Sequence, residues 1–201
     1  ESLDELPVLS NSLQWLDLSG NDLVCIPESF KLFKNLSNLN LSNNCFKNTK
    51  ENILCVTTSD NNQLGQTCRI FDLLCKLESL KYLNVSNNSL KGVFIDGENY
   101  ESARDIFSNL VELDLSYNTI DNEQDLIVCT EFISIQLIDI TGNPLASKGE
   151  QHYSSLKSAL HKNISCHLRI DPPKPEGAGS GLKPAALRKK VGHSLSLPSL
   201  K

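Results

Sequence analysis

The sequence contains no methionine, only one tryptophan and no Cys-x-x-C pair. It also has no run of about 20 apolar residues, which a membrane-spanning helix needs. The glycine-rich stretch Gly177–Gly181 is not followed by Lys-Ser or Lys-Thr, so it does not match a phosphate-binding loop. The absences argue against a paired-cysteine metal site, a membrane span and a P-loop nucleotide-binding protein. They leave a chain of 201 residues with a net charge of −5.

The cysteines are scattered along the chain rather than paired in clusters. They are Cys25, Cys45, Cys55, Cys68, Cys75, Cys129 and Cys166. An odd number of separated cysteines is typical of reduced thiols in an intracellular protein. Five Asn-x-Ser sequons point the other way, but most of them fall within the repeated motif described below. We therefore expect a cytoplasmic location.

No group of residues has the spacing of a catalytic or metal-binding site. Cys166 and His167 are adjacent, whereas metal ligands are separated along the chain. A Cys–His nucleophile pair is formally open, and the simpler interpretation is a structural residue beside a surface residue. We therefore expect no enzyme activity, no metal and no cofactor.

What the chain does contain is one motif repeated five times. In residues 13–23 it runs Leu-x-x-Leu-x-Leu-x-x-Asn-x-Leu, and the same spacing of apolar residues and asparagine recurs four more times. The later windows are residues 36–46, 80–90, 110–120 and 135–145. The asparagines of the five windows are Asn21, Asn44, Asn88, Asn118 and Asn143.

The spacing has a direct physical interpretation. Alternate residues around the central apolar positions point to one side, as in a short strand. One repeat alone cannot bury them, so successive repeats must stack into a continuous core. An asparagine side chain both donates and accepts, and it can satisfy backbone groups where the chain turns out of the strand. We therefore predict that the five asparagines form a structural ladder.

The motif resembles the leucine-rich-repeat family. The resemblance implies an α/β solenoid, with short parallel strands on the concave side and helices and irregular loops on the convex side. Five clear repeats would fill residues 1–145. Two motifs are 44 residues apart, so residues 47–79 contain either an insertion or a degenerate repeat. We favour an insertion with a helix over residues 70–77, and we expect another short helix near residues 102–107.

The residues that follow the repeats resemble an intracellular, phosphatase-regulator-like cap. This cap would fill residues 146–171, with a helix over residues 154–162 and a final strand over residues 167–171. At the other end, Leu3, Leu6 and Val8 resemble the tail of a preceding repeat. We therefore expect the chain to be part of a longer protein.

The composition changes after Asp171, where a Pro/Gly-led segment begins. Residues 172–201 contain six basic residues and one acidic residue, a net charge of +5, which leaves about −10 on residues 1–171. The simpler interpretation is a solvated solenoid joined to an extended tail. The alternative is that Arg188, Lys189 and Lys190 bind an acidic partner or pack back on the solenoid.

The residues beside the central leucines are predicted to point out onto the concave face. Trp15 and Tyr82 hold the same position in their repeats, next to several carboxylates. Exposed aromatic groups beside carboxylates suit a basic, partly apolar segment of a partner. The alternative is that Asp or Asn before the third leucine belongs to the repeat itself. The predicted binding residues of the solenoid are Trp15, Asp17, Asn40, Tyr82, Asn84, Glu112, Asp114, Tyr117 and Asp139.

The sequence therefore predicts a non-catalytic scaffold that binds other proteins. The cap and the basic tail resemble repeat proteins of the cytoskeleton and cilia and, more distantly, the X-ray radiation resistance-associated family. This resemblance implies tubulin or axonemal partners reached through the tail. A regulatory subunit of an enzyme such as a phosphatase is the first alternative, and an extracellular receptor ectodomain is the second. No nucleic acid partner is expected.

Overall fold

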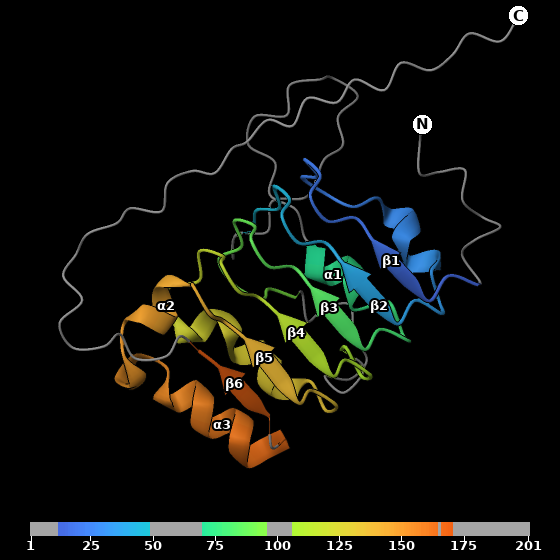
Figure 1. Cartoon of the computed structure of the whole chain (residues 1–201). Helices are drawn as coiled ribbons and strands as arrows, with labels where there is room; N and C mark the ends of the chain where they lie inside the picture. The colour runs from blue at the N-terminus through green and yellow to red at the C-terminus, as the bar shows by residue number, and fades with distance from the viewer. Residues whose placement is uncertain (1–11, 49–69, 96–105, 165, 171–201) are drawn as a thin grey trace, which may run out of the picture. The chain divides into compact units, whose positions relative to one another are not determined.

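The computed structural model describes residues 12–48, 70–95, 106–164 and 166–170. The chain divides into two units, Glu1–Asp171 and Pro172–Lys201. Within the described residues of the first unit, six three-residue strands form one parallel sheet in the order in which they occur in the sequence. They are β1 (Trp15–Asp17), β2 (Asn38–Asn40), β3 (Tyr82–Asn84), β4 (Glu112–Asp114), β5 (Leu137–Asp139) and β6 (His167–Arg169) (Figure 1).

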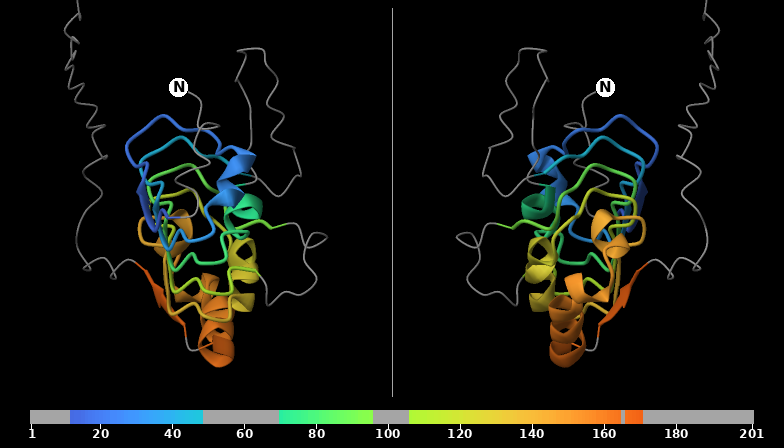
Figure 2. Two further views of the ribbon diagram at one scale, coloured as in Figure 1. Left: turned by 90° about the vertical axis from the view of Figure 1, so that its right-hand side faces the viewer. Right: turned by 90° about the vertical axis from the view of Figure 1, so that its left-hand side faces the viewer.

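Helices and turns occupy the side of the coils opposite the sheet. The helices are short because each repeat has few residues to connect one strand to the next. Three of them are 3-10 helices. Figure 2 shows helices and loops on one side of the coils and the strands on the other, as the sequence predicts for a solenoid. Their bounds are η2 Glu28–Leu32, α1 Ile70–Leu74, η5 Glu123–Glu131, α2 Pro144–Ser147, η6 Glu150–His152 and α3 Ser154–Ile164.

The stacked motifs build the core. The central apolar residues of β2 to β5 are almost fully buried, and the residues of the flanking apolar positions are buried with them. Each such leucine or isoleucine stabilises the fold by about 1.5–3 kcal/mol through removal of its side chain from water. The convex side adds edge-on aromatic pairs, with ring centroids 5.1 Å apart for Phe30–Phe33 and 5.2 Å for Phe107–Phe132. The predicted α/β solenoid is confirmed.

The asparagines of the motif link each turn to the one before it. Asn118 donates through Nδ2 to the carbonyls of Val85, Leu115 and Ser116, and its Oδ1 accepts from the backbone N–H of Leu90. Asn44, Asn88 and Asn143 make equivalent bonds in their own turns. Asn21 is exposed and bonds only to the carbonyls of Leu18 and Ser19. Within the described residues, the contacts of Asn21 therefore stabilise only its own turn.

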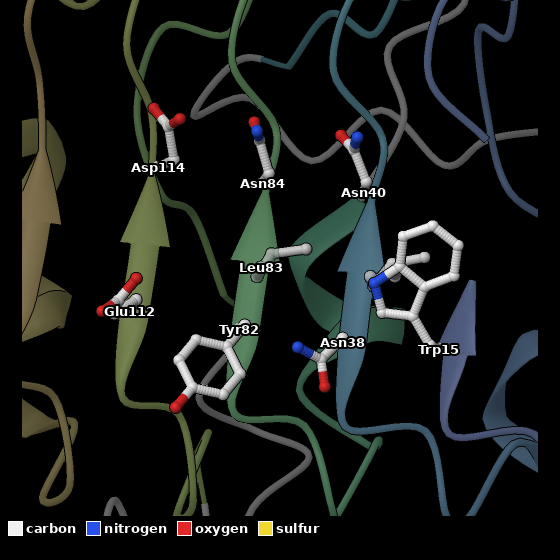
Figure 3. A pocket seen from close by; sticks show the side chains of 9 residues that line it. Trp15, Asn38, Asn40, Tyr82, Leu83, Asn84, Glu112 and Asp114 are labelled. Carbon is white, nitrogen blue, oxygen red and sulfur yellow. The ribbon is translucent and has the colours of Figure 1, made fainter. Parts of the chain in front are cut away.

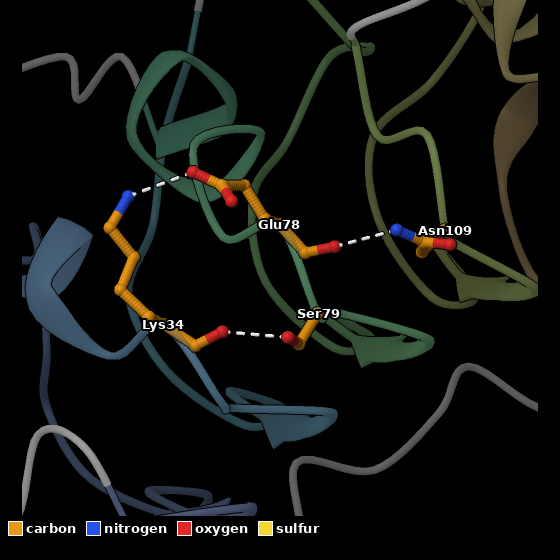
Figure 4. A network of polar contacts seen from close by, with 4 residues as sticks. All are labelled: Lys34, Glu78, Ser79 and Asn109. Carbon is orange, nitrogen blue, oxygen red and sulfur yellow. Dashed lines mark hydrogen bonds and ion pairs between the residues drawn. The ribbon is translucent and has the colours of Figure 1, made fainter.

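A second set of polar contacts joins the loops that lead into the strands. Ser79 Oγ donates to the carbonyl of Lys34 at 2.7 Å, and Asn109 Nδ2 donates to the carbonyl of Glu78 at 2.8 Å (Figure 4). The Lys34 ammonium also lies 3.0 Å from the Glu78 carboxylate. Ser134 repeats the pattern in the next turn, where its Oγ donates to the carbonyl of Ser108. The backbone of each turn is thus fixed to its neighbour outside the sheet as well as within it.

The long interval between the second and third motifs adds no strand between β2 and β3. These strands pair directly, with Asn38 opposite Tyr82 and Asn40 opposite Asn84. Residues 49–69 lie outside the described part of the chain, so the insertion that the sequence favours over a degenerate repeat stays a prediction. The predicted helix over residues 70–77 ends earlier, at Leu74, and continues as a turn. Most of the helix predicted near residues 102–107 also falls outside the described residues, and Ile106 and Phe107 belong to a turn.

A helix and a strand cover the last repeat. Helix α3 packs against η5 and β6, and its residues Leu156 and Leu160 are buried together with the preceding Tyr153. The backbone N–H of Leu156 donates to a carboxylate oxygen of Glu123 at 3.1 Å. Strand β6 then extends the sheet next to β5. The sequence predicts a cap helix over residues 154–162 and a final strand over residues 167–171, and the structure has α3 at Ser154–Ile164 and β6 at His167–Arg169.

Candidate protein-binding surface

The outward-facing residues of the sheet fall into two straight rows, because the six strands pair without any shift of register. The first row contains Trp15, Asn38, Tyr82, Glu112, Leu137 and His167. The second row contains Asp17, Asn40, Asn84, Asp114, Asp139 and Arg169. Neighbouring strands lie about 4.8 Å apart, so each row presents a side chain at that interval across the face.

The first row carries two exposed aromatic side chains. Trp15 is 63% exposed and Tyr82 is 41% exposed, which is unusual for large apolar groups. Asn38 lies between them, and its Oδ1 accepts from the Ser37 hydroxyl at 2.7 Å. The first row thus presents two aromatic rings, the amide of Asn38 and the carboxylate of Glu112 on adjacent strands.

Side chains of the second row also make hydrogen bonds within the fold. Asp17, Asn40, Asn84, Asp114 and Asp139 each accept, through Oδ1, the backbone N–H of the residue two positions later, at 2.8–3.1 Å. This bond holds the turn that leads out of the strand. The sequence analysis assigned these five residues to binding, and the structure gives each of them a role in its turn. This bond uses one side-chain oxygen of each residue, and the other oxygen or the amide nitrogen can make a further contact, as Asp139 Oδ2 does with Arg169.

The carboxylates of the second row are not equivalent. Asp139 forms an ion pair with Arg169 of β6, with 3.0 Å between Oδ2 and Nη1. Asp17 has a lowered pKa, chiefly because the hydroxyl of Ser19 donates to it and also because the backbone N–H of Ser19 does. Arg169 was missed by the sequence analysis. Aligning residues 167–169 with residues 137–139 would have placed it opposite Asp139.

The two rows enclose a hollow of about 270 Å³ on the concave face. Figure 3 shows Trp15 leaning over β2 on one side, Tyr82 on the other, and Asn40, Asn84 and Asp114 along the carboxyl ends of the strands. Six of the nine predicted solenoid residues line this hollow, and Asp17 lies in the second row on β1 without lining it. Tyr117 and Asp139 do not line it.

Tyr117 lies on the rim where the chain leaves the sheet. Its φ is 53°, in the left-handed region that bulky residues rarely adopt, and 61% of the residue is exposed. Asn43 and Asn87 hold the same position in their turns with similar φ values, and glycines hold it at positions 20 and 142. A Cβ built on Gly142 would lie 2.7 Å from Cε1 of Tyr117, so the tyrosine ring covers that glycine.

A second hollow of about 590 Å³ lies beside Tyr82, towards the loops that lead into the strands. Its apolar part includes Val111 and Ile133, which is 53% exposed. The sequence analysis missed Ile133. The equivalent positions in the other repeats are Lys34, Glu78 and Ser108, so a comparison in register would have identified the isoleucine as an exposed apolar exception.

The cap carries a third hollow, of about 310 Å³, between α3 and β6. His161, Cys166 and His167 line it, yet the described residues contain no group of three or more side chains placed to hold a metal ion. Burial raises the pKa of the Cys166 thiol to about 11, and burial raises that of Cys129 further. Both thiols are therefore protonated at neutral pH and are poor nucleophiles.

Several predicted features fall outside what the structure describes. Arg188, Lys189 and Lys190 belong to the undescribed residues 171–201. Cysteines 55 and 68 also lie outside, whereas the five described cysteines form no disulfide and three of them are buried. Within the described residues, no helix is long and apolar enough to cross a membrane.

Sequence and structure comparisons agree on one family. The model of the Leucine Rich Repeat family matches residues 12–33 and 79–97. No curated protein sequence matches the chain. Two solved structures have similar folds: a leucine-rich-repeat protein of Leptospira interrogans and the SNF/U2A′ complex of Drosophila melanogaster.

The similarity to these two structures is one of fold. The Leptospira protein is 19% identical with a TM-score of 0.57, and the match covers 85% of this chain but 34% of the other. The Drosophila structure is 20% identical with a TM-score of 0.52, and the match covers 80% of this chain and 74% of the other. The chain thus spans about a third of the length of the Leptospira protein. The repeated motif, the sheet with one strand per repeat and the matching family model identify this chain as a leucine-rich-repeat protein.

Proposed function

We propose that this protein works by binding another protein on the concave face of its solenoid, and not by catalysis. The observation that carries the proposal is the hollow between Trp15 and Tyr82, where two exposed aromatic rings flank an amide and lie near two carboxylates. Trp and Tyr are enriched among the few residues that carry most of the binding energy of an interface, and the carboxylates Glu112 and Asp114 favour a basic segment. The partner is a basic, partly apolar segment.

A solenoid of this kind suits such a role for a physical reason. Its inward positions are filled by leucine and isoleucine, while the outward positions of the sheet form a rigid surface held by backbone pairing. A rigid surface loses little conformational entropy when a partner binds. The similar Drosophila structure is itself a complex, which is consistent with a binding role for the fold.

We further propose an intracellular setting in a large assembly of the cytoskeleton or cilium, with the basic residues Arg188, Lys189 and Lys190 contacting an acidic partner such as tubulin or an axonemal component. Support comes from the five described cysteines, which form no disulfide, and from the opposite charge of tail and solenoid. A regulatory subunit of an enzyme such as a phosphatase remains the alternative, since it would use the same surface. An extracellular ectodomain is less consistent with buried thiols that form no disulfide.

The proposal is tested by native affinity purification of the full chain from cells. Trp15→Ala and Tyr82→Ala should each lose the bound partner. Leu32→Ala and Ile127→Ala are matched controls, because these residues are 50% and 45% exposed apolar side chains in the helices of the convex side. Loss of the partner in the convex variants, with retention in the concave ones, would show that the contact lies on the other side.

The nature of the partner can be read from the same experiment. Tubulin or axonemal proteins in the eluate support the cytoskeletal proposal, and a phosphatase catalytic subunit supports the alternative. Charge reversal of Arg188, Lys189 and Lys190 should weaken the contact mainly at low salt, because exposed charges are screened within about 8–10 Å at physiological ionic strength. Trp15→Ala should weaken it at every salt concentration, since buried aromatic area depends little on salt.

A further inference from the structure

The concave face contains its own example of how it binds a guanidinium group. Asp139 on β5 uses Oδ1 to accept the backbone N–H of Thr141 at 2.9 Å and Oδ2 to hold Arg169 of β6 at 3.0 Å. The Asp139 side chain is only 13% exposed, while Arg169 is 55% exposed. One aspartate in this row thus serves its turn and a cation at the same time.

Asp114, one strand away, has the same position and the same turn contact. Its Oδ1 accepts the backbone N–H of Ser116 at 2.9 Å, and its register neighbour on β5 is Asp139. Among the described residues, no lysine or arginine forms an ion pair with Asp114 or with Glu112 on the same strand. Two carboxylates of β4 are therefore left to interact with a group from outside.

Tyr82 completes the surroundings of these carboxylates. It lies directly opposite Glu112 on the neighbouring strand, and Asn84 lies opposite Asp114. Figure 3 shows the tyrosine ring and the two carboxylates on the same open face, with the hollow continuing towards Trp15. An arginine side chain is the partner group that fits both features, because a planar guanidinium stacks on an aromatic ring and pairs with carboxylates through several N–H groups.

We propose that Tyr82, Glu112 and Asp114 form a receptor for a single arginine side chain of the protein partner. The proposal rests on the proposed function and adds the identity of one partner residue. Trp15 lies two strands from Tyr82, about 10 Å away, so it contacts a neighbouring apolar residue of the same segment and not the guanidinium. The partner segment therefore presents an apolar side chain and an arginine side by side.

Substitution of Asp114 by asparagine tests the charge without disturbing the turn. Asn40 and Asn84 accept the same backbone bond at the equivalent positions, at 3.1 Å and 2.9 Å. Asp114→Asn should therefore keep the fold and remove only the carboxylate. Asp17→Asn is the matched control, because it removes the same charge from the same row on β1.

The probe is N-acetyl-arginine amide, added to the isotope-labelled full chain and followed by NMR. We expect saturable shifts at Tyr82, Glu112 and Asp114, smaller ones with the lysine analogue and none with the neutral citrulline analogue. Asp114→Asn and Tyr82→Ala should each weaken arginine binding by about threefold to tenfold, whereas Asp17→Asn, outside the proposed receptor, should leave it unchanged. Equal binding of arginine and citrulline, or shifts that ignore Asp114→Asn, would overturn the proposal.

Capture of the native partner by the variants distinguishes the arginine receptor from the broader proposal that the concave face binds a protein. If Trp15→Ala abolishes capture of the partner while Asp114→Asn and Glu112→Gln leave it unchanged, the concave face binds and the arginine receptor is wrong. If the tryptophan and tyrosine variants also retain the partner, the proposed function itself fails. If all of them lose the partner and the arginine probe binds, both proposals are supported.

Discussion

Two rows of polar side chains run across the repeats, a buried inner row and an outer row on the concave face. Both accept backbone hydrogen bonds, but they differ in how completely the fold satisfies them. The inner row consists of asparagines whose amides saturate several backbone groups of two successive turns, as at Asn118 and Asn143. The outer row, from Asp17 to Asp139, makes one backbone bond per residue to its own turn, and the rest of the side chain can contact other side chains, as Asp139 does with Arg169. A polar group that the fold satisfies completely is structural, and one that it satisfies in part remains able to bind.

The largest expected effect comes from the inner row. Asn118→Leu would remove the hydrogen bonds of the Asn118 side chain to three buried carbonyls and to the N–H of Leu90. We therefore expect the free energy of unfolding to fall by at least about 3 kcal/mol. Asn21→Leu is the control and should cost less than about 1 kcal/mol, since its partners are exposed to water. Chemical denaturation measures both. Equal losses would contradict the distinction between a buried ladder and its exposed end.

A glycine comparison tests the rim between the two rows. Gly20 and Gly142 have φ values of 69° and 74°, but only Gly142 lies under the ring of Tyr117. Gly20→Ala should cost about 1 kcal/mol from backbone strain alone, and Gly142→Ala about 1–3 kcal/mol more because the methyl group collides with the ring.

A double variant identifies the cause of the glycine difference. Tyr117→Asn places at this position the residue found at Asn43 and Asn87, and it removes the ring. In that background the extra cost of Gly142→Ala should fall, which thermal melting of the four proteins would reveal. An unchanged cost would mean that the ring yields and that only the backbone is strained.

The outer row should tolerate a change of charge but not the loss of its turn contact. Asp114→Ala removes the acceptor of the Ser116 N–H and should cost about 0.5–2 kcal/mol, as the loss of a comparable cap does. Asp114→Asn should change the stability by less than about 0.5 kcal/mol. Denaturation of the two variants beside the parent distinguishes them, and a large loss in the asparagine variant would show that the carboxylate itself stabilises the fold.

The smallest effect is electrostatic and concerns Asp17. Its pKa lies below its ordinary value of 3.8, first because of the Ser19 hydroxyl, so Ser19→Ala should raise that pKa towards the ordinary value. A lowered pKa in the fold contributes stability above the ordinary value and loses it as the pH falls through the folded value. The inner row has no such dependence, because amides do not titrate. An NMR titration of the Asp17 carboxyl in both proteins provides the measurement, and identical pKa values would contradict the assigned cause.

The sequence by itself determined the repeat unit. Period-two alternation around the central leucines, such as Leu39 and Leu83, fixes which side chains face inward, and the spacing to Asn44 and Asn88 fixes where the chain turns. These are local properties, because they depend on bonds and side-chain directions within about ten residues. The register pairing of Trp15 with Tyr82 through Asn38 also follows, since equal motifs stack without a shift.

The tertiary structure alone decided which groups meet across turns. An alignment places Arg169 opposite Asp139, but the 3.0 Å ion pair between them depends on how the cap strand joins the sheet, and the contact of Tyr117 with Gly142 depends on the stacking of successive turns. The motif likewise could not show that one carboxylate oxygen of Asp114 accepts the backbone N–H of Ser116 in its own turn. Each of these contacts joins atoms positioned by different repeats. Only the packed solenoid sets their separation, because the residues between them do not constrain it.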